Sequence, residues 1–182
     1  MRPLAGRCVP GPTQALKRYD APVIYLNALE FLEEEHEAFR PYEALDELSD
    51  EALERPVEAA HGWSGRDLMG HIVSWFEPSV TVARELAVGP RSETKERLDA
   101  EWASGGDAVN ARLIAEWAAL PLDEVRRRFR EVPGELRGTL TVVPAIRWLK
   151  DPDYLRYFMD ETIDHYADHM DDLAAVLAAA GR

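Results

Sequence analysis

The chain has 182 residues, a formal net charge of −13 and a hydrophobic content of 46%. This length and apolar content suffice for one domain with a sizeable core, and they exclude a chain that stays disordered. The acidic charge repels nucleic-acid phosphates and anionic membranes, and no apolar run approaches the ~20 residues that span a bilayer. We therefore expect neither nucleic acid nor membrane among its partners.

The N-terminal segment is rich in proline and glycine. We expect residues 1–15 to form a flexible tail and residues 16–182 to form a single helical domain. The tail lacks the apolar segment of a secretory signal. It contains Cys8, the only cysteine, which cannot form an internal disulfide and therefore fits a reducing compartment. These features predict a cytoplasmic protein.

Apolar periodicity predicts a first long helix from Leu16 to Phe39. A later start just after Asp20 is an alternative, because Ala21-Pro22 suits the first turn of a helix. A short helix is expected to follow Ser49.

The second long helix is predicted over about residues 64–89. Ser64 and Asp67 have the spacing of a capping box at its start. Pro78 lies inside the run, and we expect it to kink the helix or to split it at Glu77.

A third helical region covers residues 93–119 and is interrupted at residues 104–106. A fourth helix should run over about residues 122–131, where Pro133-Gly134 breaks or bends it. Residues 139–143 have strand-like composition, but this segment is too short to indicate a sheet.

The last helix is predicted over about residues 153–180. No internal repeat and no long linker divides the chain. The pattern therefore predicts an all-α domain, a four-helix bundle of the up-down type.

Three of the five histidines form the most informative pattern. His165 and His169 have i, i+4 spacing on the last predicted helix, so they share one face and can bind one transition metal together. His71 lies in the middle of the second long helix. If these two helices meet, the three imidazoles converge and leave coordination positions open, as in catalytic metal sites.

Two carboxylates lie one helical turn before these histidines. Glu161 precedes His165 and could orient its ring or serve as a fourth ligand, and Asp67 precedes His71. For Asp67 the competing interpretation is a helix cap.

A simpler interpretation of the histidines also stays open. A histidine on a helix is more often exposed or hydrogen-bonded in the core, and acidic faces such as the one around His165 contain solvated histidines. His36 and His61 are assigned to this class.

Three motifs of this chain resemble the DinB-like superfamily of damage-inducible metalloproteins, which includes the metal-binding domain of mycothiol-dependent maleylpyruvate isomerases. Gly62-Trp63-Ser64-x-x-Asp67-Leu68-x-x-His71, followed by Trp75, resembles its second-helix motif. Residues 162–169 resemble its C-terminal His-x-x-x-His helix, and residues 49–53 match the short stretch between its first two helices. The resemblance covers about residues 23–177.

The resemblance implies a four-helix bundle that holds a divalent metal, usually nickel or zinc, on His71, His165 and His169, with water at the other positions. It also implies a homodimer in many members, and a low-molecular-weight thiol such as mycothiol or bacillithiol as co-substrate in some. This chain departs from the family pattern at residues 133–144, where prolines interrupt an expected continuous helix.

Two functions are therefore open. The first is a metal-dependent thiol transferase or hydrolase that attacks a small electrophile, because a metal held by neutral imidazoles ionises a bound water or thiol near neutral pH. The second is a non-catalytic, metal-stabilised bundle that binds a small molecule or a partner in a stress response.

Loose candidates for the substrate pocket walls, for which core packing is the alternative, are Trp75, Phe158 and Tyr166. An anionic thiol would need an arginine-lined groove, for which the candidates are Arg66, Arg112, Arg147 and Arg156.

Overall fold

The computed structural model describes residues 25–182, and every regular element in this range is helical. The predicted all-α class is confirmed. The predicted tail, residues 1–15, lies outside the described residues together with Cys8. Within the described part, no helix is long and apolar enough to cross a membrane.

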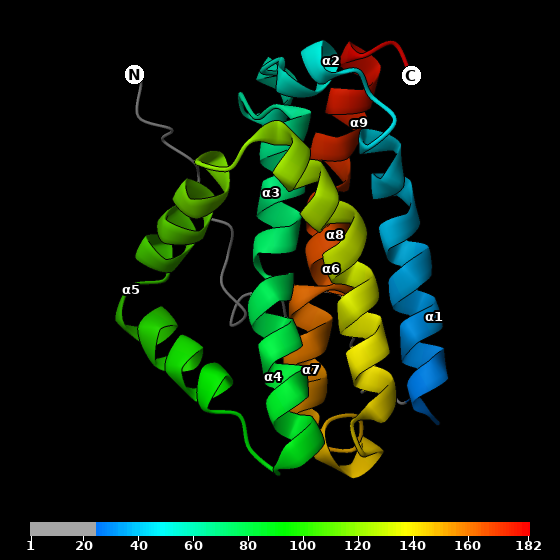
Figure 1. Ribbon diagram of the computed structural model, residues 1–182, viewed down its shortest axis with the longest axis vertical. Coiled ribbons are helices and arrows are strands. Elements are labelled where there is room, and N and C mark those ends of the chain that lie inside the picture. The colour runs from blue at the N-terminus through cyan, green and yellow to red at the C-terminus, as the bar shows by residue number, and fades with distance from the viewer. Residues whose placement is uncertain (1–24) are drawn as a thin grey trace.

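Four long helical segments, the legs of the bundle, each consist of one helix or of successive helices (Figure 1). They are α1 (Ala28–Phe39); α3 (Gly65–Ser74) continued by α4 (Phe76–Val88); α6 (Leu122–Val142); and α7 (Pro152–Glu161) continued by α8 (Ile163–Asp168) and α9 (Met170–Ala179). A further helix, α5 (Glu93–Ala118), lies beside the bundle against α3 and α4. Successive long segments alternate in direction, and α5 is the return leg that lets α4 and α6 run the same way (Figure 1).

The short elements lie mostly at one end of the bundle. They are η1 (Arg40–Leu45), α2 (Asp50–Glu54), η2 (Glu58–Ala60) and, at the other end, η3 (Ala145–Arg147). The predicted short helix after Ser49 is α2, and the Ser49 side chain accepts a hydrogen bond from the backbone of Ala52.

The start of α1 corrects a prediction. The helix begins at Ala28, later than either predicted start, because the side chain of Asn27 accepts hydrogen bonds from the backbone N–H groups of Leu29 and Glu30. This cap satisfies two donors that the first turn leaves free. Residues 16–24 of the predicted helix lie outside the described residues.

The second leg has the predicted cap and a break near the predicted one. Asp67 accepts hydrogen bonds from both the backbone N–H and the hydroxyl of Ser64, which completes the capping box. The break falls at Trp75, between α3 and α4, and not at Glu77. A proline ring clashes with the carbonyl four residues earlier, and for Pro78 that residue is Ser74, the last of α3.

The predicted break of the fourth helix is wrong. Helix α6 continues through Pro133 to Val142, and the residues with strand-like composition up to that point are helical. Pro133 is buried on the face that also carries Phe129 and Leu136. Burial of this face against the core outweighs the ~3 kcal/mol that an interior proline costs. The departure at residues 133–144 therefore leaves the helix continuous up to Val142.

The last leg is broken at two residues. Thr162 (φ −127°, ψ −93°) separates α7 from α8, and His169 (φ −105°, ψ 10°) separates α8 from α9. The Thr162 hydroxyl donates to the carbonyl of Phe158 at 2.5 Å, so the side chain occupies an acceptor that the break leaves free. The predicted continuous helix over 153–180 is thus three segments.

Helix α5 is also broken where the sequence predicts an interruption. Gly105 has non-helical backbone angles (φ 166°, ψ 72°). The half before it carries Trp102, and the half after it packs Trp117 against Gly70 of α3, where an added Cβ would lie 3.2 Å from the Trp117 Cβ. Trp75 forms a small second core with Trp102, Val109 and Leu113.

Candidate metal centre

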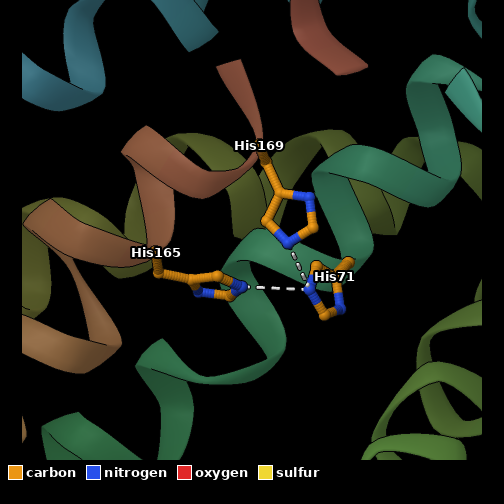
Figure 2. A group of neighbouring side chains, drawn as sticks. All are labelled: His71, His165 and His169. Atoms are coloured by element: carbon orange, nitrogen blue, oxygen red, sulfur yellow. Dashed lines mark hydrogen bonds between the residues drawn. The ribbon is translucent and has the colours of Figure 1, made fainter. Parts of the chain in front are cut away.

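Three histidine rings meet between α3 and the last leg of the bundle (Figure 2). The Nε2 atom of His71 lies 3.0 Å from the Nε2 atoms of both His165 and His169. All three residues are buried, with exposed fractions of 3%, 6% and 5%. Among the described residues, this is the cluster of candidate metal-ligand side chains.

The break at His169 contributes to this arrangement. His165 lies within α8, whereas His169 lies at the junction of α8 and α9, and both rings point toward His71 (Figure 2). The Trp63 ring covers the cluster, with its centroid 4.9 Å from that of His71 and 5.5 Å from that of His169. An indole placed in this way excludes water from the imidazoles on that side.

Burial keeps two of the rings neutral. The pKa of His71 falls to about 3, first because of burial and then because of the nearby His169. Burial also lowers the pKa of His165 well below its ordinary value, and His71 and His169 add to this effect. Both rings are therefore neutral at pH 7, the form in which histidine binds a metal.

The geometry fits a bound cation. A neutral imidazole has one N–H and one lone pair, so His71 Nε2 cannot form an ordinary hydrogen bond with both neighbouring Nε2 atoms. A metal–nitrogen bond of about 2.0–2.1 Å places neighbouring ligand nitrogens about 2.9–3.4 Å apart. The observed separations of 3.0 Å lie in this range. A divalent transition metal would accept all three lone pairs at once.

The outer contacts of the rings differ from the predicted ones. The Nδ1 atom of His169 lies 2.9 Å from a carboxylate oxygen of Asp172, which is the contact that orients metal-binding histidines. Asp172 was not predicted from the sequence, although its position one turn after His169 is the signal that could have indicated it. Among the described residues, the buried Nδ1 atoms of His71 and His165 have no hydrogen-bond partner of ordinary geometry, although the backbone carbonyl of Glu161 favours the charged form of His165.

The two carboxylates proposed from the sequence lie elsewhere. The Asp67 side chain is bound to Ser64 in the helix cap, as the competing interpretation expected. Glu161 lines a neighbouring cavity and is not part of the ligand cluster found among the described residues. His36 is exposed on α1, and the exposed His61 lies 3.8 Å from Asp172, outside the cluster.

A cavity of about 320 Å³ is lined by residues four positions along the chain from His71 and from His165, but by none of the three histidines. It lies between the first half of α5, α7 and the junction of α3 and α4, and its lining residues are Trp75, Lys95, Leu98, Asp99, Trp102, Asp153, Arg156, Tyr157, Asp160 and Glu161. Burial raises the pKa of Glu161 to about 8, and the neighbouring Asp160 and Asp99 act in the same direction. Of the aromatic residues proposed as walls, Trp75 lines this cavity, whereas Phe158 and Tyr166 are buried in the core.

The four candidate arginines do not converge on the centre as free cations. Arg66 and Arg147 donate to backbone carbonyls, and Arg112 pairs with two glutamates of its own helix. Arg156 lines the cavity but is bound by two aspartates. These contacts argue against a groove built for an anionic thiol.

One comparison with known proteins gives a match. The family of mycothiol maleylpyruvate isomerase N-terminal domains matches residues 32–168, which include His71 and His165 and end one residue before His169. No curated protein and no solved structure matches the chain. The family match covers well over half of the sequence, and the helical fold and the buried histidines agree with it. The chain belongs to the family of mycothiol maleylpyruvate isomerase N-terminal domains, which is DinB-like, and its buried three-histidine cluster suggests a divalent metal site.

Proposed function

We propose that this protein is a metal-dependent enzyme whose active centre is formed by His71, His165 and His169. It either transfers a thiol to a small electrophile or hydrolyses that electrophile. The observation that carries the proposal is the meeting of three buried Nε2 atoms, two of them on rings that are neutral at pH 7. A set of neutral ligands leaves a bound divalent metal its full charge, which suits a catalytic centre.

The residues of the chain have separate roles in this proposal. The three imidazoles hold the metal, with nickel and zinc as the expected ions. Asp172 fixes the tautomer of His169 through Nδ1, so that Nε2 keeps its lone pair for the metal. Trp63 limits access of water from one side. When bound, the metal supplies a Lewis acid that favours the ionised form of a thiol or water.

The family supports a low-molecular-weight thiol as the second substrate, since its description names mycothiol. Because the candidate arginines are engaged in other contacts, we expect such a thiol to be bound mainly through neutral groups. A homodimer stays a prediction from the family resemblance, and light scattering of the purified protein tests it.

The second candidate is a non-catalytic bundle that the metal stabilises. The deep burial of the three histidines favours it, because a centre with little access to solvent also suits a structural ion. The cavity lined by Trp75 and Glu161, four residues along the chain from His71 and His165, favours the enzyme instead, since it offers room for a substrate.

Metal analysis by mass spectrometry tests the proposal. We expect about one nickel or zinc ion per chain in the untagged protein, and its loss in the His165→Ala, His169→Ala double variant. The His36→Ala variant is the matched control, because this exposed histidine lies outside the cluster. Protein that takes up no metal after incubation with nickel or zinc would contradict both candidates.

Thiol chemistry separates the two candidates. Metal-loaded protein is mixed with mycothiol or bacillithiol and a panel of small electrophiles, and thiol consumption is followed. Turnover that disappears in the double variant supports the enzyme. A metal-loaded protein that turns over neither thiol nor hydrolysable substrate supports the structural role.

A further inference from the structure

The cavity beside the histidines has the size of a small-molecule site. Its volume of about 320 Å³ lies at the low end of the ~300–1,000 Å³ typical of such pockets. Trp75, four residues after His71, and Glu161, four residues before His165, both line it. The cavity is therefore lined by residues close in sequence to two of the histidines, although none of the three histidines lines it.

The two basic side chains in its wall are already neutralised. The Lys95 ammonium lies 2.8 Å from a carboxylate oxygen of Asp99 and 3.0 Å from one of Asp153. Arg156 is held by Asp160 and, at 2.8 Å, by Asp164. Each cation is matched by two carboxylates, so the wall offers a surplus of negative charge and no cation that is free to bind an anion.

Glu161 is the carboxyl group of this wall that the protein leaves without a partner. Only 8% of Glu161 is exposed. Among the described residues, its side chain has no hydrogen bond and no ion pair. Its oxygens are not among the described atoms that are closed off from solvent without a partner, so they reach accessible space in the cavity. A donor group on a molecule in the cavity can therefore bind to them.

The apolar part of the wall suits an organic cation. The rings of Trp75 and Trp102 lie edge to face with centroids 5.7 Å apart, and Leu98 lies beside them. The protein already places one ammonium group here, because Lys95 Nζ lies 5.7 Å from the ring centroid of Tyr154 and 5.8 Å from that of Tyr157. Aromatic faces attract such cations when water is excluded.

We propose that this cavity binds a small organic ammonium compound, with its ammonium group on Glu161 and its apolar body against Trp75 and Trp102. The donor on the ligand completes the hydrogen bonding of Glu161, and its positive charge balances the surplus carboxylates. Binding itself needs no metal. The further statement that such a compound is the substrate rests on the proposed function, because it requires the adjacent metal centre to be active.

Tryptophan fluorescence of metal-free protein tests the binding. The probes are 2-phenylethylammonium, the neutral 2-phenylethanol and the anionic 3-phenylpropanoate, which share an aromatic body and differ in charge. We expect the ammonium probe to change the emission of Trp75 and Trp102 saturably and to bind at least tenfold more tightly than the other two. Equal affinities for the three probes, or no saturable change with the ammonium probe, would overturn the proposal.

A variant that cannot ionise at position 161 locates the site. Glu161→Gln keeps the shape of the side chain, and we expect it to weaken binding of the ammonium probe at least tenfold. Glu33→Gln, at an exposed position of α1, should bind as the wild type does. An unchanged affinity in Glu161→Gln overturns the assignment. Because the titrations use metal-free protein, a protein that binds the probe but no metal would refute the proposed function and leave this inference standing.

Discussion

Acid should destabilise the metal-free protein through His71. Its pKa is about 3 in the folded chain, against an ordinary value of 6.5. The unfolded chain therefore binds an additional proton between these two values, and the free energy of unfolding rises with pH across that window. His165 acts in the same direction, because burial lowers its pKa as well.

The size of the effect follows from the two pKa values. A difference of about 3.5 pKa units corresponds to about 5 kcal/mol of stability, which is fully present above pH 6.5 and lost as the pH falls to about 3. Between pH 6 and pH 4, His71 alone should account for a loss of about 2.5 kcal/mol. The low exposure of His71 means that solvent screening reduces this figure little.

Urea unfolding at several pH values measures this loss. Wild type is compared with His71→Gln, which keeps a polar side chain that does not titrate. Glu161 has the opposite effect, because its pKa is raised in the folded chain and the free energy of unfolding therefore falls as the pH rises from 4.5 to 8. This contribution is common to wild type and variant, so it cancels when their free energies are subtracted. Equal pH dependence of wild type and variant would refute the reasoning.

Zinc binding followed by calorimetry in two buffers at pH 6 should also release almost no protons from His71 and His165.

Further substitutions test other parts of the structure. Asp172→Asn should weaken metal binding about 10–100-fold in a chelator competition, because it removes the carboxylate on His169 Nδ1. Arg137→Met should lower the free energy of urea unfolding by about 3–5 kcal/mol, since it leaves the carboxylate of Glu35 without its ion pair. Glu35 is only 1% exposed. Adding Glu35→Gln to this variant should restore part of the lost stability. Gly65→Ala should lower the free energy of unfolding by about 1–3 kcal/mol in the same assay, because its Cβ would lie 2.7 Å from a core leucine. Gly134→Ala, in open space within α6, should raise the free energy of unfolding by about 0.5–1 kcal/mol.

The sequence predicted those features that local chemistry determines. The capping box of Ser64 and Asp67 depends on side chains three residues apart, and it forms as expected. The interruption near Gly105 likewise follows from residues that do not favour a helix. The meeting of the second long helix with the last one was a conditional prediction, and the packing of the fold brings His71 to His165 and His169.

Features that depend on tertiary packing could not be predicted in this way. Proline at position 133 predicts a helix break from local propensity, but the burial of its ring with Phe129 and Leu136 outweighs that preference. The position of Glu161 depends on tertiary structure in a similar way. Its spacing from His165 places it one turn away, yet the break at Thr162 follows it directly, and its side chain lines the cavity instead.

The last leg reaches His71 with a break at His169. In a regular helix, residues four apart, such as His165 and His169, also share one face and can bind one metal together. With His169 at the junction of α8 and α9, both Nε2 atoms reach the same atom of His71 at 3.0 Å. Two of the rings also bury Nδ1 atoms that have no partner of ordinary hydrogen-bond geometry among the described residues. The fold therefore brings three buried imidazoles together, and a bound cation would accept the lone pairs of their Nε2 atoms and stabilise the folded chain.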